Sequence, residues 1–326
     1  MLTRRSFLAS ASALSASALF APALLRAQEP LVLWGPTATP SILLAQAAAS
    51  GDLDAIAPGA TFSAWRTPDE LRAGISSGSI LASLVPSYVA ANFYNRGLGL
   101  RLANIQTYGL LTIVSADPEI ENIEGLRGKT VNVPFRNDMP DFVLQRLLDN
   151  AGLVAGEDLT IEYSGTPADA MQLLLSGRAD TVLISEPAAT AALARAGEAG
   201  RDLRRAVDLT QAWSAISGKP MIPQAGLGIT DRLVERIGDD GVEALQVAIE
   251  NALEAVLADP ESAAALVAEA FGQPAPIIAR AIPNSNLVAT RASAIKQDIA
   301  DFYDVLAGAN PDIIGGRQPD DDFYAL

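Results

Sequence analysis

The chain has 326 residues, contains neither cysteine nor histidine, and carries a formal net charge of −15. The missing residues exclude disulfide and thiolate chemistry, and they remove the commonest general base and metal ligand, so no metal site and no cofactor are predicted. A chain this acidic is also a poor binder of nucleic acid.

Residues 1–27 are typical of an export signal. Arg4 and Arg5 precede a mildly apolar Ala/Ser/Leu stretch, and small residues end it near Ala27. The Arg-Arg-x-Phe-Leu order resembles a twin-arginine signal. A membrane anchor is the alternative, but the apolar stretch is short and rich in serine and alanine. Cleavage would remove three arginines and no acid, taking the net charge from −15 to −18. No cysteine follows, so a soluble periplasmic protein rather than a lipid-anchored one is expected.

An internal repeat follows at an offset of 99 residues. The stretch "TFSAWRTPDELRAGISSGS" begins at Thr61, and "TIEYSGTPADAMQLLLSGR" begins at Thr160. Each predicts a strand, a Thr-Pro helix start and a Ser-Gly stop. Apolar runs at 80–86 and 179–185 come next, as in parallel strands buried on both faces. Thr-Pro and Ser-Gly pairs are common, but agreement in order and spacing argues against coincidence.

The repeat extends upstream to 31–49 and 130–148, where Gly35 aligns with Pro134. Each half therefore reads strand–helix–strand–helix–strand. The sequence predicts an α/β protein made of two doubly wound lobes. About 300 mature residues also exceed what one core usually organises.

Two segments are expected to cross between the lobes. Residues 100–117 read as one long strand, and "AGLGIT" within 211–237 should return the chain. Residues 231–308 then predict helices, which form a C-terminal extension on the first lobe, and the last eleven residues, "GRQPDDDFYAL", predict a loosely packed tail. The expected boundaries are 28–112 with 226–326 for the first lobe, and 113–225 for the second.

A ligand cleft is expected between the lobes, because ligands of open parallel sheets bind beyond the carboxyl ends of the strands. The two crossings would act as a hinge. By this rule the candidate ligand-binding residues are Pro36, Thr37, Ser87, Tyr88, Arg136, Asn137, Asp138, Thr166 and, through the repeat, Glu186. The crossings add Tyr108, Trp213 and Gln224. The repeat maps Ser87-Tyr88 onto Glu186-Pro187, so these pairs should face each other.

Several stretches carry a family resemblance. Residues 164–193, "SGTPADAMQLLLSGRADTVLISEPAATAAL", together with "LRGKTVNVP" (126–134) and "NAGLVAGEDL" (150–159), resemble ABC-importer substrate-binding proteins for nitrate, sulfonates, taurine and thiamine-precursor pyrimidines. The resemblance covers most of 30–235. It implies the type II periplasmic-binding fold, a ligand in the cleft, and a permease and an ATPase as partners. A monomer is expected.

The turn before the helix at 139 leaves two interpretations of Arg136. It lies where helix amides favour an anion, so we expect it to contact an anionic group of the ligand. The alternative is a salt bridge to Asp138 or Asp141. Asp138 is a natural N-cap with Asp141 at capping-box spacing, which explains it without a ligand. Asn137 is either a turn residue or a ligand donor.

The remaining candidates are also open to two interpretations. Glu186 suits a solvated helix start, whereas the resemblance favours a contact with an amine or heterocyclic N–H of the ligand. Trp213 and Tyr108 would either stack on a flat ligand or pack the hinge. Together with Arg136, these residues favour a zwitterion or a polar heterocycle over nitrate.

The predicted function is the solute-binding component of an ABC importer, and not an enzyme. The alternative is an enzyme on the same fold, such as a pyrimidine-synthesis or chorismate-dehydratase-like protein. Its acid/base candidates would be Glu186, Asp138, Tyr88 and Tyr108. A sensory module is a third class.

Overall fold

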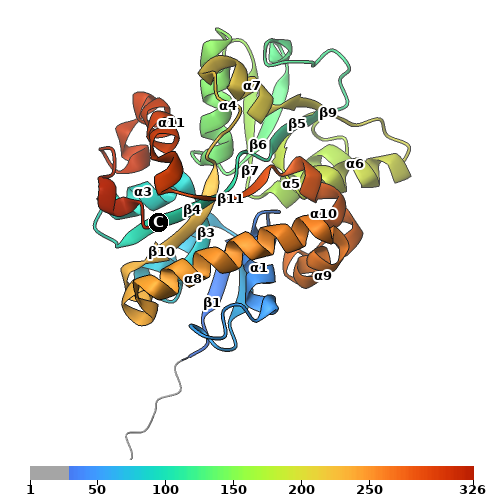
Figure 1. Cartoon of the computed structure of the whole chain (residues 1–326). Helices are drawn as coiled ribbons and strands as arrows, with labels where there is room; N and C mark the ends of the chain where they lie inside the picture. The colour runs from blue at the N-terminus through green and yellow to red at the C-terminus, as the bar shows by residue number, and fades with distance from the viewer. Residues whose placement is uncertain (1–28) are drawn as a thin grey trace, which may run out of the picture. The chain divides into compact units, whose positions relative to one another are not determined.

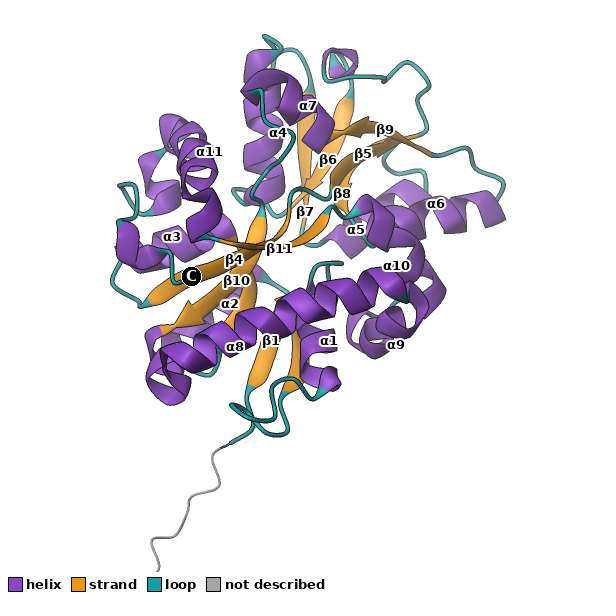
Figure 2. Cartoon of the chain, viewed as in Figure 1, coloured by secondary structure: helices purple, strands orange, loops and turns teal. Residues whose placement is uncertain are grey.

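Two mixed sheets organise the chain (Figures 1 and 2). The computed structural model describes residues 29–326, so the expected export signal at 1–27 lies outside the described residues. Residues Leu31–Leu326 form one compact unit. Within it, each sheet is the centre of one lobe.

The first sheet has the strand order β11-β4-β10-β3-β1-β2. Its strands are β1 (Val32–Pro36), β2 (Thr61–Trp65), β3 (Ala82–Pro86), β4 (Leu100–Thr107), β10 (Ala225–Thr230) and β11 (Leu287–Arg291). β1 pairs in parallel with β2 and β3, while β10 runs antiparallel to β3 and β4.

The second sheet has the order β7-β6-β8-β5-β9. Its strands are β5 (Leu111–Ser115), β6 (Thr130–Pro134), β7 (Thr160–Ser164), β8 (Thr181–Ser185) and β9 (Arg204–Asp208). The parallel set β8-β6-β7 repeats the order β3-β1-β2 of the first sheet, so the sequence repeat corresponds to a repeated topology.

Helices cover both faces of both sheets, which confirms the predicted α/β class with two doubly wound lobes. The helices before the second crossing are α1 (Ser41–Ser50), α2 (Pro68–Ser77), α3 (Ser87–Asn95), α4 (Met139–Asn150), α5 (Pro167–Leu175), α6 (Ala188–Glu198) and α7 (Leu209–Ser217). Those after the second crossing are α8 (Asp231–Ala258), α9 (Pro260–Phe271), α10 (Ala275–Ala281) and α11 (Lys296–Ala309). Short 3₁₀ turns include η2 (Ile282–Asn284), η4 (Pro311–Ile314) and η5 (Asp321–Phe323).

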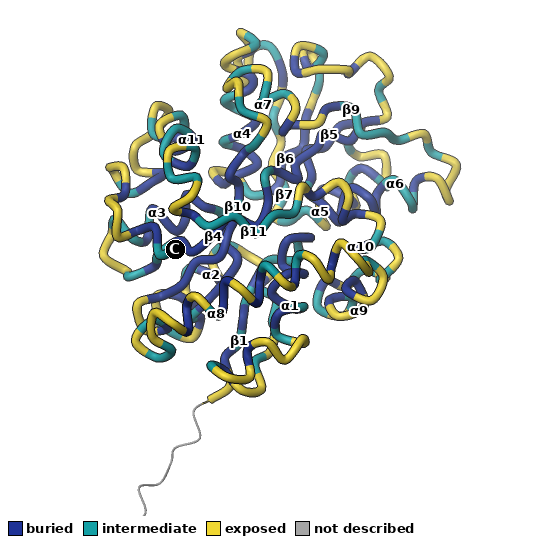
Figure 3. Tube along the Cα trace, viewed as in Figure 1, coloured by how far each residue is buried: buried dark blue, intermediate teal, exposed yellow. Residues whose placement is uncertain are grey.

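The core forms on both sides of the strands (Figure 3). On the first sheet, α1, α8 and α9 pack on one face and α2, α3 and α11 on the other. On the second sheet, α4 and α7 oppose α5 and α6. The first four residues of β3 and of β8 are all buried, as predicted for parallel strands covered on both faces.

The Thr-Pro helix starts are confirmed in both lobes. The Thr67 hydroxyl accepts a hydrogen bond from Glu70 N, and Thr166 accepts one from Asp169 N. The upstream alignment of Gly35 with Pro134 is wrong by one residue. Strand pairing makes Pro36 the equivalent of Pro134, since each closes a strand beside the end of its parallel neighbour. Strand pairing sets the register, so the one-residue difference between the two halves lies in the connection between the paired parallel strands.

The first crossing differs from the predicted long strand. β4 ends at Thr107 in the first sheet and β5 starts at Leu111 in the second, so the chain changes sheets at 108–110 rather than after 112. Gly109 has a φ of 121° there, and a Cβ on it would come within 2.1 Å of Thr210 Oγ1. This kink divides the apolar run into two strands.

Two predictions for the C-terminal region are wrong. The stretch 231–308 contains a strand, β11, which pairs antiparallel with the edge of β4. The tail is also firmly packed, because Phe323 is fully buried and Ala325 N donates to Leu102 O. Phe323 and Tyr324 supply the apolar surface that packs the tail. The polar residues before them make the tail as a whole look polar in the sequence.

Candidate functional site

A small cavity lies where strands of both sheets end. Its volume is about 110 Å³. The ends of β1, β2, β3, β6 and β8, the starts of α4 and α5, and both crossings contribute to it. The lining includes Pro36, Thr37, Trp65, Arg66, Pro86, Leu110, Leu111, Phe135, Asp138, Met139, Pro140, Pro167, Ser185, Gln224 and Ala225. This is the position that the strand-end rule predicts for a ligand of parallel sheets.

The size of the cavity limits the ligand. Pockets for drug-sized ligands are roughly 300–1,000 Å³. With the lobes placed as they are, the cavity suits a solute of a few heavy atoms.

Four donor groups in the lining have no protein acceptor. Within residues 29–326, no hydrogen bond or ion pair engages the hydroxyls of Thr37 and Ser185 or the guanidinium of Arg66. Gln224 is 6% exposed, and its Oε1 accepts from Leu110 N at 3.4 Å, while its Nε2 has no partner among these residues. The cavity therefore presents donors that a ligand acceptor would satisfy.

Asp138 supplies the acidic group of the lining and links the lobes. It is the N-cap of α4, and its Oδ1 accepts from Met139 N at 2.8 Å and from the Tyr88 hydroxyl of the first lobe. Arg72 Nη2 lies 3.7 Å from Oδ2. Burial raises the pKa of Asp138, and burial together with this carboxylate raises the pKa of Tyr88 well above its usual value.

Four of the twelve predicted site residues line this cavity: Pro36, Thr37, Asp138 and Gln224. Ser87 is buried beside it, where its backbone N donates to Gln224 O and its hydroxyl donates to Pro223 O. Tyr88 contacts Asp138 rather than Glu186. In the second lobe Glu186 N donates in the same way to Leu110 O. The equivalent pairs therefore bind the two crossing segments.

Glu186 lines a separate polar pocket of about 300 Å³. Its side chain is 1% exposed, and its carboxylate pairs with Arg205, whose Nε lies 3.2 Å from Oε1. Oε2 accepts from Thr190 N at 3.1 Å. Its backbone oxygen accepts from Thr39 N of the first lobe. Both oxygens of the carboxylate are thus engaged by residues of their own lobe.

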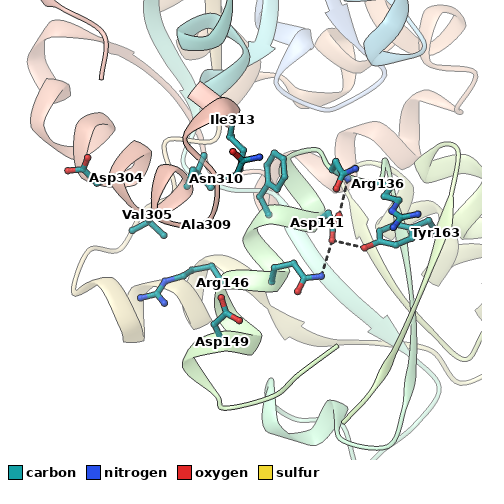
Figure 4. A pocket seen from close by; sticks show the side chains of 15 residues that line it. Arg136, Asp141, Arg146, Asp149, Tyr163, Asp304, Val305, Ala309, Asn310 and Ile313 are labelled. Carbon is teal, nitrogen blue, oxygen red and sulfur yellow. Dashed lines mark hydrogen bonds between the residues drawn. The ribbon is translucent and has the colours of Figure 1, made fainter. Parts of the chain in front are cut away.

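Arg136 and Asn137 line a wider groove of about 880 Å³ between α4 and the α11 region (Figure 4). The Arg136 guanidinium lies over the Tyr163 ring, 5.1 Å from its centroid, and among the described residues it forms no ion pair with Asp138 or Asp141. Asp141 accepts from Asn137 N at 2.9 Å and from the Tyr163 hydroxyl at 3.1 Å. In a capping box Asp141 would accept from the backbone N of the N-cap, Asp138, but here it accepts from the N of Asn137, one residue earlier.

The last three predicted residues have structural partners. Thr166 caps α5. The Tyr108 hydroxyl donates to Thr290 Oγ1 at 2.8 Å, and the buried Trp213 ring packs edge-on against Phe302, with centroids 5.5 Å apart. Both aromatics thus pack at the hinge, which was the alternative interpretation.

Sequence reasoning missed Arg66 and Ser185, although the signal was present. Arg66 directly follows the predicted strand that starts at Thr61, and Ser185 closes the apolar run 179–185. The strand-end rule applies to both positions.

No helix in the described part of the chain has the length and apolar character needed to cross a membrane. No group of three or more acidic, histidine or cysteine side chains placed to hold a metal ion occurs in residues 29–326.

Solved structures share this fold. An ABC transporter from Parabacteroides distasonis is 20% identical over 91% of this chain and 98% of its own, with a TM-score of 0.73. The periplasmic aliphatic sulphonate-binding protein of Escherichia coli is 18% identical over 91% of this chain and 92% of its own, with a TM-score of 0.70. The periplasmic nitrate-binding protein of Synechocystis PCC 6803 is 15% identical over 77% of this chain and 69% of its own, with a TM-score of 0.61.

No curated protein matches the chain. The family model for the ABC transporter phosphonate periplasmic substrate-binding protein matches residues 78–277, more than half of the chain. The chain therefore belongs to this family, and it is the substrate-binding component of an ABC importer and not an enzyme.

Proposed function

We propose that the protein captures a small organic anion with a sulfonate- or phosphonate-like head in the cavity between its lobes. The observation that carries this proposal is the set of four donors without acceptors, on Thr37, Arg66, Ser185 and Gln224. They come from both lobes and from the second crossing, so one ligand would join all three.

An anion satisfies this donor set for physical reasons. Gln224 is buried, Thr37 and Ser185 are half-buried and Arg66 is exposed, and a hydrogen bond from such a donor to a charged acceptor is worth about 1.5–3 kcal/mol. The starts of α4 and α5 also line the cavity, and helix N-termini favour negative charge. Leu110, Leu111, Phe135 and Met139 would cover a short alkyl group.

The comparisons support this ligand class without deciding it. The matching family is named for phosphonates, and solved structures of the same fold are named for aliphatic sulphonates and nitrate. A flat heterocycle such as a thiamine precursor is less favoured, because Tyr108 and Trp213 lie outside the lining and the cavity is small.

Binding measurements test the anion. We expect calorimetry on the mature protein to detect ethanesulfonate or ethylphosphonate, and to detect no binding of ethyl methyl sulfone, the uncharged analogue of the sulfonate. Native mass spectrometry of the purified protein would show whether it retains such an anion. Equal binding of the sulfone would contradict the proposal.

Two arginines provide a matched pair of variants. Arg66 lines the cavity, while Arg136 lines the outer groove. Arg66→Ala should weaken anion binding about tenfold, the loss of one charge-assisted hydrogen bond, whereas Arg136→Ala should change it less than threefold. The reverse order would favour Arg136 as the residue that contacts the anion, as predicted from the sequence.

The delivery route is also a proposal. Export through the twin-arginine pathway, work as a monomer, and transfer to a permease and an ATPase fit the signal at 1–27 and the family. Changing Arg4 and Arg5 together to lysine should hold the precursor in the cytoplasm. Normal processing of that double variant would mean that the general pathway reads the signal.

A further inference from the structure

The wall between the cavity and the protein surface is thin at the seam of α3 and α4. Asp138 of the second lobe lines the cavity. Its partners Tyr88 and Arg72 of the first lobe line a surface groove of about 350 Å³ instead, together with Phe142. The contacts among these residues therefore separate the cavity from the groove.

Three contacts close this wall, and each of them joins the two lobes. The Tyr88 hydroxyl donates to Asp138 Oδ1. Arg72 Nη2 forms an ion pair with Asp138 Oδ2 at 3.7 Å. The Tyr88 ring meets the Phe142 ring edge-on, with centroids 5.4 Å apart.

We propose that Tyr88, Asp138 and Arg72 form a gate, and that release of the Tyr88–Asp138 bond opens the cavity to solvent at the seam of α3 and α4. The gate controls access for any ligand that the cavity holds. The inference therefore does not depend on the anion proposed above.

The bond between Tyr88 and Asp138 is the strongest part of the gate. Both residues are buried, with 4% and 6% of their surface exposed. Burial and the charge of Asp138 raise the pKa of Tyr88 well above its usual value, so the phenol keeps its proton and donates it to the carboxylate. Hydrogen bonds to an ionised acceptor are stronger than those between neutral groups. The Arg72 pair is weaker, because that side chain is 41% exposed and solvent screens its charge.

The gate can open without unfolding either lobe. Asp138 keeps its hydrogen bond from Met139 N when Tyr88 moves away, so α4 stays capped. The lobes also meet on the opposite face of the second sheet, where Arg195 Nη2 donates to Gln273 Oε1 at 3.3 Å. Neither of those two residues lines the cavity. Release at the α3–α4 seam is thus the opening that reaches the cavity directly.

A single thiol can measure this opening, because the chain contains no cysteine. Val85 is fully buried and lines the cavity. Val85→Cys would therefore place a thiol that a maleimide reaches only when the cavity opens, and the labelling rate of the mature protein would report the open fraction. The measurement needs no ligand, so its failure is distinguishable from failure of the proposed anion to bind.

Tyr88→Phe in the Val85→Cys protein should speed labelling about tenfold, because it removes the hydrogen bond and keeps the ring contact with Phe142. Arg72→Met should speed it only about two- to threefold. In an Asp138→Ser background serine still caps α4 but offers no carboxylate to Tyr88, so Tyr88→Phe should have almost no further effect. That loss of additivity would identify Asp138 as the group through which Tyr88 acts.

Two variants are matched controls. Tyr94→Phe removes another hydrogen bond from a tyrosine of α3 to an aspartate, Asp320, but this bond lies within the first lobe. Gln273→Ala removes the bond with Arg195, which joins the lobes on the other side. Both variants should label at the rate of the Val85→Cys parent.

Three outcomes would overturn the inference. One is an unchanged labelling rate in Tyr88→Phe, and another is an equal rise in Gln273→Ala, since the lobes would then part on the other side. The third is a rate that rises steeply with low concentrations of urea in Tyr88→Phe, because labelling through global unfolding depends on urea and labelling through the gate does not.

Discussion

Buried carboxylates show how residue-scale environment separates two similar side chains. Glu186 and Asp138 both follow a strand of the second lobe at the start of a helix. Glu186 is neutralised by Arg205 from β9, whereas Asp138 accepts hydrogen bonds from neutral donors and forms a longer ion pair with Arg72. The contacts of Glu186 lie within its own lobe, whereas those of Asp138 with Tyr88 and Arg72 join the two lobes.

Arg205→Met is expected to destabilise the protein by about 2–3 kcal/mol, because it leaves Glu186 buried without its cation. The upper range for a buried pair is not expected, since the Arg205 side chain is 32% exposed. Denaturant unfolding measures the change. Arg127→Met, which breaks the more exposed pair with Asp158, is the control and should cost less than about 1 kcal/mol. Equal losses of unfolding free energy in the two variants would show that the Glu186–Arg205 pair contributes no more to stability than the exposed pair.

The raised pKa of Asp138 predicts that the stability of the protein depends on pH. Its pKa in the folded protein is raised above the usual 3.8 by burial, so its ionised form costs stability at neutral pH. That cost is removed as the pH falls through the raised folded value toward 3.8. The Asp138→Asn variant lacks this titration. The melting temperature of the wild type minus that of the variant should therefore rise as the pH falls from 7 to 4. A difference that stays constant, or moves the other way, would mean that the carboxylate is fully compensated in the unliganded protein.

At the scale of elements, the repeat places equivalent caps in both lobes. α2 and α5 each start with a Thr-Pro pair followed by an acidic side chain in the first turn. These caps satisfy helix amides that have no partner within the helix. Their contribution is local, so it should be alike in the two lobes.

Thr67→Ala and Thr166→Ala should each lower the unfolding free energy by about 1 kcal/mol, the usual effect of losing a threonine cap. Thr166→Ser keeps the hydroxyl and should lose less. Because Thr166 lies outside the cavity lining, Thr166→Ala should leave ligand affinity unchanged in calorimetry. Weakened binding without a stability loss would instead support Thr166 as the ligand contact predicted from the sequence.

At the scale of the whole molecule, the crossings control how the lobes meet. Tyr108 N donates to Asn286 O, and Ile222 N donates to Tyr108 O, so the first crossing is bound on both sides. Gly109 then passes close to the start of α7. Because this segment joins the sheets, a local change there alters the cavity between them.

Gly109→Ala should destabilise the protein more than Gly156→Ala. Both glycines have positive φ, at 121° and 88°, so each alanine introduces backbone strain. An added Cβ at Gly109 meets Thr210 Oγ1 at 2.1 Å, while nothing lies within 4 Å at Gly156. Overpacking adds about 1–3 kcal/mol, which thermal melts can measure. Thr210→Ala should recover part of it, and equal losses at the two glycines would exclude the clash.

The sequence by itself determined the elements that depend on local chemistry. The period of apolar residues, the Thr-Pro starts and the Ser-Gly stops predicted both lobes and the parallel strands β2, β3, β7 and β8. The strand-end rule also placed Pro36, Thr37 and Asp138 at the cavity, and the predicted second crossing placed Gln224 there, because both depend on topology and not on side-chain direction.

Only the tertiary structure decided which way the other side chains point. The Arg136 guanidinium lies over the ring of Tyr163, which is on β7, the parallel neighbour of β6. Glu186 pairs with Arg205, which is 19 positions later in the chain. The Tyr88–Asp138 bond joins residues 50 positions apart in different lobes. Partners this distant leave no local pattern, since a rotamer at a strand end is chosen by whatever the fold brings beside it. The same holds for β11 and the C-terminal residues, whose short apolar stretches gain stability only by adding to the edge of β4 and to the core beside it.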